Sequence, residues 1–316
     1  DTKIVSVVLN EESGLWTVTT SHKERIVCRY LVLAIGALSE PKTPDIDGVD
    51  TFSGDTYFTS NWPKDHTVDL TGKRVGIVGT GSSGVQAIPE IAKTASEVHV
   101  FQRTANYVTP TRSGPMDPDL VAKLRKDPHA VRQASRETYG GHTPLDIGKE
   151  RFLELDKAGR ERALSEAWDG TYVPLAFRDA YLPEANAAIS DFIRGKMLEQ
   201  VNDSWTANHL VPWDHPFGGK RPCMSNVYLQ TYNLPHVHLV PLSETPIEHI
   251  TTDGVKTTEE LIPLDVIVYA TGFDAISGPL FAIDISGISG KSITEAWEDG
   301  PANYLGTMVH GFPNLF

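Results

Sequence analysis

Apolar and polar residues alternate with a period of two along residues 3–35, where β-branched side chains are frequent. This pattern is typical of strands that bury one face, so we predict a small antiparallel meander with a turn at residues 12–14. The apolar run YLVLAIG (30–36) lacks this alternation and ends in glycine. It predicts a strand buried on both faces that leads into a tight turn.

A different pattern follows residues 37–73, which are rich in Pro, Gly and Asp and which we interpret as a linker. From Lys73 onward, the sequence predicts an apolar strand (74–78), a glycine turn, an amphipathic helix (about 83–95) and a second strand (98–102). These elements make a complete βαβ unit, the building block of a parallel sheet.

Residues 112–205 change to a helical periodicity and predict a helical insertion in the domain that begins with this βαβ unit. The predicted helices occupy 117–126, 149–168 and 186–200, and the predicted later strands occupy 236–242, 245–258 and 264–274. This order of strands and helices favours the α/β class.

Charge and cysteine content limit the partners and the compartment. The formal net charge of −13 disfavours a nucleic-acid partner, because phosphates attract clustered Lys and Arg. No apolar run reaches the ~18 to 20 residues that a membrane helix needs, so we expect no membrane partner. The two cysteines, Cys28 and Cys223, exclude a disulfide framework and favour a reducing, cytoplasmic location.

The strongest motif is the glycine turn, which follows the predicted strand and opens the predicted helix. In this context G-x-G-x-x-G favours a dinucleotide site over a glycine turn without a ligand. The first glycine permits a tight turn, the second lets the backbone approach a pyrophosphate, and the third allows close packing of helix and strand. The helix N-terminus offers free N–H groups to the phosphates. The predicted dinucleotide contacts are Gly79, Thr80, Gly81, Ser82, Ser83, Gly84 and Gln86.

The end of the second strand distinguishes the dinucleotide. An NAD site usually carries Asp or Glu about 20 residues after the glycines, whereas here Gln102 is followed by Arg103 and Thr104. A guanidinium can pair with a 2′-phosphate through two parallel hydrogen bonds. The sequence therefore predicts NADPH, with the alternative that Arg103 is a solvated surface charge.

Two further segments bring backbone or charge to a sheet edge. Ala270-Thr271-Gly272 ends an apolar strand, and LAIG (33–36) has the same form, which suggests a second nucleotide domain split around the first. An ordinary turn explains either segment alone. Lys220-Arg221 lies between Gly-Gly and Pro and predicts an ordered anion-binding loop, with a solvated basic turn as the alternative.

A histidine pair was considered as a metal site. His236 and His238 share one face of a predicted strand, but no third ligand with zinc-like spacing accompanies them. We therefore predict no metal.

Taken in order, these segments resemble the type I Baeyer–Villiger monooxygenases, of the phenylacetone and cyclohexanone monooxygenase kind. The family fingerprint F-x-G-x-x-x-H-x-x-x-W-P is matched by Phe52, Gly54, Trp62 and Pro63, shortly before the glycine turn. Flavin-containing monooxygenases share the first half of this fingerprint but not its Trp-Pro ending. The other matching blocks, which span the whole chain, are LAIGALSEP, VFQRT, FGGKRP, YATGFD, GPANYLG and GFPNLF.

The resemblance implies an enzyme that uses FAD, NADPH and O2 to insert oxygen next to a ketone carbonyl, through a C4a-peroxyflavin, and gives an ester or lactone. It implies that Arg221 is the catalytic arginine that stabilises the negative charge of the intermediates, and that Lys220, Arg103 and Thr104 contact the 2′-phosphate. The alternatives are a related N- or S-oxidising flavin monooxygenase, an uncoupled NADPH oxidase, or a non-catalytic NADP(H)-binding fragment.

Two departures from the family pattern affect these expectations. Phe58 stands where the fingerprint has histidine, which removes any hydrogen bond made there and predicts impaired coupling between the domains. The family's N-terminal G-x-G-x-x-G and the segment after GFPNLF are absent from the 316 residues. We therefore expect a fragment that binds FAD poorly.

The resulting prediction is an α/β fold with two Rossmann-like dinucleotide-binding domains, of which the FAD domain is incomplete. Part of the FAD-binding domain is placed at 1–45, the linker with the fingerprint at 46–72, the NADP-binding domain at 73–263 with its helical insertion at about 112–205, and a truncated return to the FAD-binding domain at 264–316. The expected partners are a small ketone and O2, and the expected state is a monomer or weak oligomer.

Overall fold

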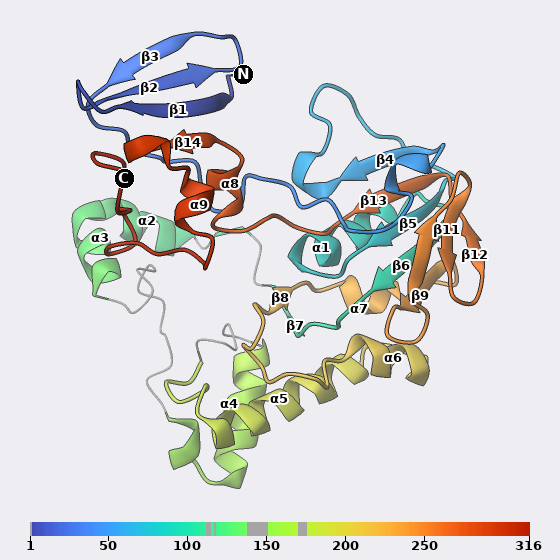
Figure 1. Ribbon diagram of the computed structural model, residues 1–316. Helices are drawn as coiled ribbons and strands as arrows, with labels where there is room; N and C mark the ends of the chain where they lie inside the picture. Colours follow the sequence, from blue (N-terminus) through green and yellow to red (C-terminus); the bar gives the residue numbers. More distant parts are fainter. Residues whose placement is uncertain (1, 112–114, 117, 138–150, 170–175) are drawn as a thin grey trace. The chain divides into compact units, whose positions relative to one another are not determined.

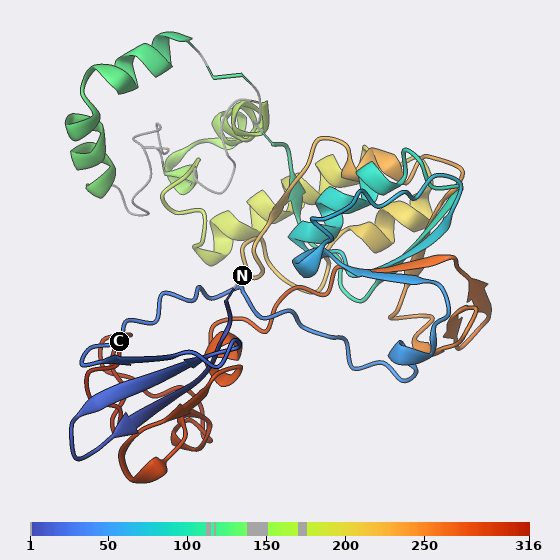
Figure 2. The ribbon, with the colours of Figure 1, turned by 90° about the horizontal axis from the view of Figure 1, so that it is seen from above.

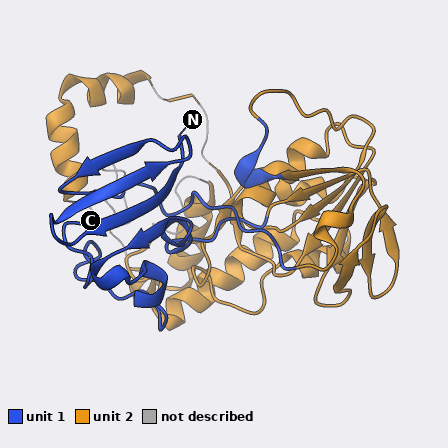
Figure 3. Cartoon of the chain, turned by 45° about the horizontal axis from the view of Figure 1, so that its top comes forward, with its two compact units in different colours: residues 1–45, 58–63, 271–316 blue, residues 46–57, 64–270 orange. Residues whose placement is uncertain are grey.

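The computed structural model describes residues 2–111, 115–116, 118–137, 151–169 and 176–316 (Figure 1). The chain forms two compact units (Figure 3). Unit 1 contains residues 1–45, 58–63 and 271–316, and unit 2 contains residues 46–57 and 64–270. Within the described residues, the structure has no helix with both the length and the apolar character needed to cross a membrane.

Unit 1 is built on a four-stranded sheet in the order β14-β1-β2-β3. Strands β1 (Ile4–Asn10), β2 (Leu15–Thr20) and β3 (Arg25–Cys28) are antiparallel neighbours, so the predicted meander is confirmed. Strand β14 (Asp284–Ser286) pairs in parallel with β1. The alternating apolar side chains face one core, which contains Val7, Leu9, Trp16, Val18, Ile283, Ile285, Ile293, Trp297, Phe312 and Leu315.

Short helical turns complete unit 1. They are α8 (Gly278–Phe281), η5 (Ile288–Gly290) and α9 (Ile293–Ala296). Helix α9 begins at a capping box, in which the Ser292 hydroxyl accepts the Glu295 N–H while the Glu295 carboxylate accepts the Ser292 N–H. Such a box satisfies two of the helix's free N–H groups and places Ile293 in the core.

The prediction of a doubly buried strand at 30–36 is wrong. The segment forms one bridge, between Leu31 and Leu315, and further backbone hydrogen bonds to residues 314–316. Leu31, Leu33 and Ile35 pack against the unit 1 core, whereas Val32 is 69% exposed. A strand buried on both faces needs apolar cover on both, and the described residues of unit 1 cover only one.

Unit 2 is built on a five-stranded sheet in the order β4-β13-β5-β6-β9. Strands β13 (Val266–Tyr269), β5 (Arg74–Val78), β6 (Glu97–Gln102) and β9 (Val237–Pro241) are parallel neighbours. Helix α1 (Ser82–Ile91) connects β5 to β6 and confirms the predicted βαβ unit. Its buried face includes Val85, Ile88 and Ile91, at the spacing of one helical stripe.

A three-stranded antiparallel sheet precedes β13 in the chain. It consists of β10 (Ile247–Ile250), β11 (Gly254–Thr257) and β12 (Leu261–Pro263). In Figures 1 and 2 this sheet lies on one side of the five-stranded sheet, whereas α1 lies on the other side. Both faces of the parallel strands are thereby covered, which explains why all four residues of β13 are buried.

The structure differs from the predicted return to the FAD-binding domain at residue 264. Strand β13 pairs with β5 from Val266 opposite Val75 to Tyr269 opposite Val78, so it is part of unit 2. The apolar residues of β13 are buried by this pairing, which sequence order alone did not reveal. Unit 1 resumes at Thr271.

The segment predicted as a linker contains regular structure. Residues 49–51 form η1 (Val49–Thr51), residues 55–58 form β4 (Asp55–Phe58) at the edge of the five-stranded sheet, and residues 59–61 form η2 (Thr59–Asn61). A side chain at Gly54 would overlap the backbone oxygen of Asp265, so a larger residue would not fit beside it. The fingerprint glycine thus has a packing role within unit 2.

The helical insertion lies between two short parallel strands, β7 (Val108–Thr109) and β8 (Cys223–Met224). The helix predicted at 117–126 corresponds to α2 (Pro118–Lys126), and the one predicted at 186–200 corresponds to α5 (Pro183–Leu198). The one predicted at 149–168 is instead the 3-10 turn η3 (Phe152–Glu154) followed by α4 (Lys157–Asp169). Residues 112–114, 117, 138–150 and 170–175 of the predicted insertion lie outside the described residues. The elements are α2 (Pro118–Lys126), α3 (Pro128–Arg136), η3 (Phe152–Glu154), α4 (Lys157–Asp169), α5 (Pro183–Leu198) and α6 (Ser204–Leu210), and α7 (Tyr228–Thr231) follows β8.

Candidate functional site

The glycine turn lies at the carboxyl end of β5 and leads directly into α1. Gly79 adopts φ 108°, a conformation that strains any side chain, and its N–H donates to the Phe101 carbonyl at 3.0 Å. Gly81 is the N-cap of α1, with an extended backbone and no side-chain cap. The N–H groups of the first turn of α1 therefore have no side-chain acceptor at the cap, as an anion-binding helix N-terminus requires.

The second and third glycines of the turn differ in their surroundings. A Cβ built on Gly84 would overlap the Gly79 carbonyl oxygen and would lie 3.6 Å from the Ala270 side chain. A Cβ on Gly81 meets nothing within 4 Å. Gly84 is thus required for packing of α1 against the turn, whereas Gly81 leaves open space above the backbone that a pyrophosphate can occupy.

The end of β6 is joined to the glycine turn by a side chain. The Thr80 hydroxyl donates to the Thr104 carbonyl at 3.2 Å. Arg103, the residue directly after β6, is exposed. Among the described residues, no hydrogen bond or ion pair to its side chain is found. Because the guanidinium makes no such bond within the protein, all five of its N–H groups are available to donate hydrogen bonds to a ligand.

The segment 220–224 is brought to the same edge through Cys223. The Cys223 thiol lies 3.7 Å from the Ser82 hydroxyl and 3.4 Å from Nδ2 of Asn106. Asn106 Nδ2 also donates to the Arg221 carbonyl at 2.9 Å, and β8 pairs with β7 immediately after it. The backbone of Arg221 is therefore anchored to the loop that follows β6, while its side chain is exposed.

Asn106 was not predicted from the sequence. It belongs to no motif, and its contacts join segments 115 residues apart, so no local signal identifies it. Cys223 was considered only for disulfides. Burial raises the pKa of its thiol, which stays protonated and serves as a packing contact rather than a nucleophile.

Lys220 differs from Arg221 in having an ionic neighbour. Its Nζ lies 4.0 Å from a carboxylate oxygen of Asp214, and both side chains are about half exposed. The pKa of Asp214 is lowered mainly by its hydrogen bond from His215, with Lys220 contributing least. This long, solvated pair is weak, so Lys220 can exchange it for a phosphate.

The remaining predicted contacts are distributed over both units. Gln86 is exposed on α1, and Ser83 is half-buried in its first turn. Ala270 directly follows β13 in unit 2 and donates its N–H to the Val78 carbonyl at 2.8 Å. Thr271 and Gly272 lie in unit 1, where the Thr271 hydroxyl donates to the Lys42 carbonyl at 2.7 Å and Gly272 adopts φ 81°.

The two strand-to-glycine ends predicted at 36 and 272 belong to one local structure. Within unit 1, Lys42 N–H donates to the Gly272 carbonyl, Pro41 bridges Phe273, and Asp274 N–H donates to the Glu40 carbonyl. The segments 37–42 and 271–276 thus run side by side in opposite directions. Gly36 adopts φ 75° where the first of them begins.

The chain is similar along its whole length to proteins named as monooxygenases. Residues 1–134 match a family described as pyridine nucleotide-disulphide oxidoreductase. Over its whole length the chain is 40% identical to a 2-oxo-Δ3-4,5,5-trimethylcyclopentenylacetyl-CoA monooxygenase of Pseudomonas putida, covering 59% of it. It is likewise 37% identical to a phenazine N-monooxygenase of Lysobacter antibioticus (58% covered) and 35% identical to a Baeyer–Villiger monooxygenase of Pseudooceanicola batsensis (58% covered).

The whole chain also superposes on solved structures and covers a similar share of their length. A crystal structure described as OTEMO in complex with FAD and NADP superposes with a TM-score of 0.93 at 40% identity, covering the whole chain and 61% of that protein. The α/β fold with Rossmann-like domains is thereby confirmed. The chain spans about three-fifths of the length of the relatives that it matches.

Proposed function

Because this chain is homologous along its whole length to the Baeyer–Villiger monooxygenases, we propose that it contributes the NADPH-binding part of an enzyme that converts a ketone into an ester or lactone. The overall reaction consumes the ketone, O2, NADPH and one proton, and it yields the ester, NADP+ and water. The observation that carries the proposal is the clustering of the glycine turn, Arg103 and the Lys220-Arg221 loop at one edge of the parallel sheet of unit 2.

Unit 2 supplies the features that a pyrophosphate and a 2′-phosphate need. The open space at Gly81 and the N-terminus of α1 receive the pyrophosphate. Arg103 pairs with the 2′-phosphate through its guanidinium, with Lys220 as a second cation and Thr104 beside them. Since Gln102 is uncharged and no acidic residue ends β6, nothing there repels a phosphate.

Arg221 has the chemistry of an electrostatic catalyst. Its guanidinium is a permanent cation, and anchoring of its backbone by Asn106 limits the positions that it can take. A cation held where negative charge develops lowers the barrier and raises the rate, typically by a factor of about 10² to 10³ for one donor. When bound, FAD supplies the activation of O2 and NADPH supplies the electrons.

Unit 1 is proposed to be part of the FAD-binding domain. The paired segments 37–42 and 271–276 bring two glycines with positive φ, Gly36 and Gly272, into one local structure. Thr271 and Gly272 are the proposed flavin contacts of this segment. Within residues 1–316 the G-x-G-x-x-G sequence occurs once, in unit 2.

The test measures NADPH oxidation in the presence of added FAD and a panel of ketones. The protein used contains residues 1–316 together with any sequence that its gene encodes before or after them. The expected product is an ester or lactone that has gained one labelled atom from ¹⁸O2. Arg221→Ala is expected to lower product formation about 10²- to 10³-fold while NADP+ still binds, and Arg221→Lys is expected to retain part of the activity.

Other outcomes would redirect the proposal. Hydrogen peroxide without any oxygenated product indicates an uncoupled oxidase. Because one relative is named for N-oxidation, the panel includes an aromatic N-heterocycle, and an N-oxide as the sole product indicates that chemistry instead. Unchanged ester formation in Arg221→Ala contradicts the role given to Arg221.

A further inference from the structure

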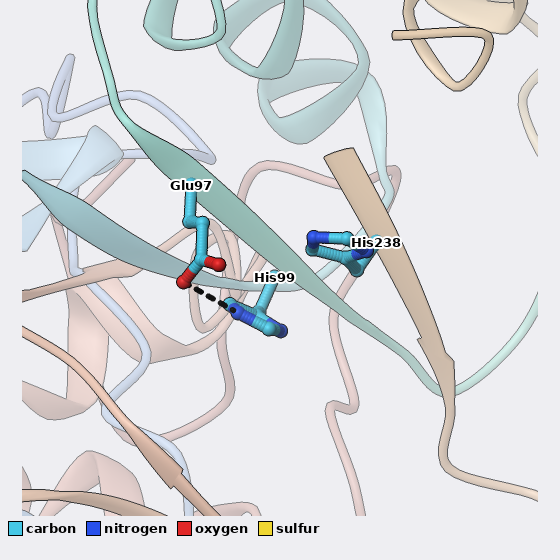
Figure 4. Close-up of side chains that lie close together, drawn as sticks. All are labelled: Glu97, His99 and His238. Carbon is cyan, nitrogen blue, oxygen red and sulfur yellow. Dashed lines mark ion pairs between the residues drawn. The ribbon is translucent and has the colours of Figure 1, made fainter. Parts of the chain in front are cut away.

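Three side chains with metal-binding atoms meet on one face of the parallel sheet, away from the glycine turn. Glu97 and His99 lie two residues apart on β6, and His238 lies directly opposite His99 on β9 (Figure 4). One ligand atom from each residue lies within 4.8 Å of the other two. We propose that Glu97, His99 and His238 bind a divalent transition-metal ion of the Zn²⁺ type.

The distances are close to those of a formed site. Metal–ligand bonds of about 2.0 to 2.1 Å in a tetrahedral arrangement place the ligand atoms about 3.3 Å apart. The Nε2 atom of His99 and Oε2 of Glu97 are already 3.7 Å apart, and the rings of His99 and His238 have centroids 5.0 Å apart at an angle of 32°. The three ligand atoms, which lie within 4.8 Å of one another, therefore need to approach by at most about 1.5 Å.

The donor set matches the proposed ion. Two imidazoles and one carboxylate are common ligands of Zn²⁺ in sites that keep a fourth position for water. All three residues are half-buried, so a water molecule can reach the open position.

The surrounding charges also favour a cation. Glu97 belongs to the site, and Glu260 of the β11–β12 turn is near enough to act on His99. The cation next to Glu97 is Arg74, whose guanidinium is held by both oxygens of Asp265. The local charge from these four groups is therefore negative, as a metal ion requires.

The site differs from the histidine pair considered in the sequence. His236 Nε2 is 2.9 Å from the Ala92 carbonyl and is committed to that contact. His238 instead finds its partners on the neighbouring strand. The sequence near His236 and His238 contains no third metal ligand with zinc-like spacing. The pairing of β6 with β9 places Glu97 and His99 beside His238 instead.

The ion would join two strands that are 140 residues apart in sequence. Strand β9 is the last strand of the sheet order, so it has a hydrogen-bonded neighbour on one side. A metal bound by His238 on β9 and by Glu97 and His99 on β6 would fasten this strand to the sheet. The role that we assign is structural, because the three ligands come from the paired strands β6 and β9 and the metal would bridge these two strands.

The test measures Zn²⁺ binding to untagged, metal-stripped protein by equilibrium dialysis. Thermal unfolding with and without Zn²⁺ then measures the effect of binding on stability. We expect about one Zn²⁺ per chain and a higher unfolding midpoint with the metal. His99→Asn and His238→Asn are each expected to lose at least tenfold in Zn²⁺ affinity, as even removal of indirect supports does. Glu97→Gln is expected to weaken binding in the same direction.

Matched controls separate this site from other histidines and from misfolding. His249→Gln changes an exposed histidine of the same unit and is expected to leave Zn²⁺ affinity unchanged. Each variant is also tested for NADP+ binding without Zn²⁺, which reports an intact unit 2. Absorption of Co²⁺-loaded wild-type protein gives the coordination independently of any variant. Absence of saturable binding, or tight binding that persists in both histidine variants, overturns the proposal.

Discussion

At the scale of single residues, the three glycines of the turn have separate roles that their spacing does not reveal. Gly79 is needed for its positive φ, and Gly84 is needed because a side chain would overlap the Gly79 carbonyl. Gly81 has an ordinary backbone conformation and open space around it. A ligand in that space would be obstructed by a side chain at residue 81.

This contrast predicts opposite results for two similar substitutions. Gly84→Ala is expected to destabilise the protein by about 1 to 3 kcal/mol, because the turn and α1 must separate. Gly81→Ala is expected to change stability by less than about 0.5 kcal/mol while lowering NADP+ affinity about tenfold. Urea unfolding and NADP+ titration distinguish the two.

A control for the glycine variants is available in α5. A Cβ at Gly195 meets nothing within 4 Å, and the residue is in a helix interior. Gly195→Ala is expected to stabilise the protein by about 0.5 to 1 kcal/mol without changing NADP+ affinity. Full NADP+ affinity in Gly81→Ala contradicts the pyrophosphate position.

We propose that Arg103 selects NADPH over NADH. Removal of a charged hydrogen-bonding partner costs about 1.5 to 3 kcal/mol, so Arg103→Ala is expected to weaken NADPH binding by about tenfold to a hundredfold. NADH has no 2′-phosphate, and its binding is expected to stay unchanged. The exposed Arg25 on β3 provides the control, since Arg25→Ala leaves both affinities as they are. Equal losses for NADPH and NADH would indicate a general effect on folding.

Phe58 is the residue at which the chain departs from the family fingerprint. Its backbone is extended, with φ −113° and ψ 129°, a conformation open to histidine as well. Phe58→His is expected to raise the yield of ester per NADPH several-fold and to lower hydrogen peroxide, because an imidazole restores donor and acceptor atoms. Phe58→Leu, which restores neither, is the control. An equal gain in both variants shows that side-chain size is the cause.

At the scale of elements, the parallel sheet of unit 2 is held at its start by one ion pair. Both oxygens of Asp265 accept from the Arg74 guanidinium, at 2.8 and 3.1 Å, and Oδ2 also accepts the Arg74 N–H at 2.8 Å. These bonds align β13 with β5. They hold the pKa of Asp265 at about 2, below its ordinary 3.8.

The lowered pKa predicts the effect of acid on stability. A carboxyl group with a lowered folded-state pKa stabilises the protein above its unfolded pKa, and this contribution is lost as the pH falls from about 4 to about 2. For a pair that is partly exposed, the contribution is about 1 kcal/mol. Asp265→Asn is therefore expected to lower the free energy of unfolding by about 1 kcal/mol at pH 7, with the difference disappearing near pH 2.

Urea unfolding of both proteins at several pH values checks this expectation. Asp191 provides the control, because its ion pair with Arg194 is on the surface of α5 and its side chain is 76% exposed. Asp191→Asn is expected to leave stability nearly unchanged at every pH. A difference between Asp265→Asn and wild type that does not depend on pH would show that the effect is one of packing.

At the scale of the whole molecule, the chain has two units with different proposed ligands. Unit 2 contains the G-x-G-x-x-G turn and the cations, and unit 1 contains the segments paired around Gly272. Hydrogen exchange is expected to show that NADP+ protects residues 79–86 and 103–104, with no protection at 4–20. The purified 316-residue chain is expected to carry much less than one flavin per chain, and near-stoichiometric yellow colour contradicts this.

Elements whose residues are contiguous in the chain, and the glycine turn among them, could be predicted from local patterns of amino acids. The G-x-G-x-x-G turn lies between a strand and a helix that are contiguous in the chain, so local periodicity was sufficient to predict them. The meander of unit 1 was predictable for the same reason. The positive charge of Arg103 after β6 could be predicted for the same reason, because Arg103 directly follows the strand in the sequence.

Contacts between segments that are distant in the sequence became known from the folded structure alone. The pairing of β13 with β5, the inclusion of β4 in the sheet, the anchoring of Arg221 by Asn106 and the meeting of His99 with His238 all join residues far apart in sequence. The apolar pattern of a strand indicates that the strand is buried, but it does not indicate which other strand lies beside it. Strand pairing selects that neighbour, and the side chains of both strands then form the sites.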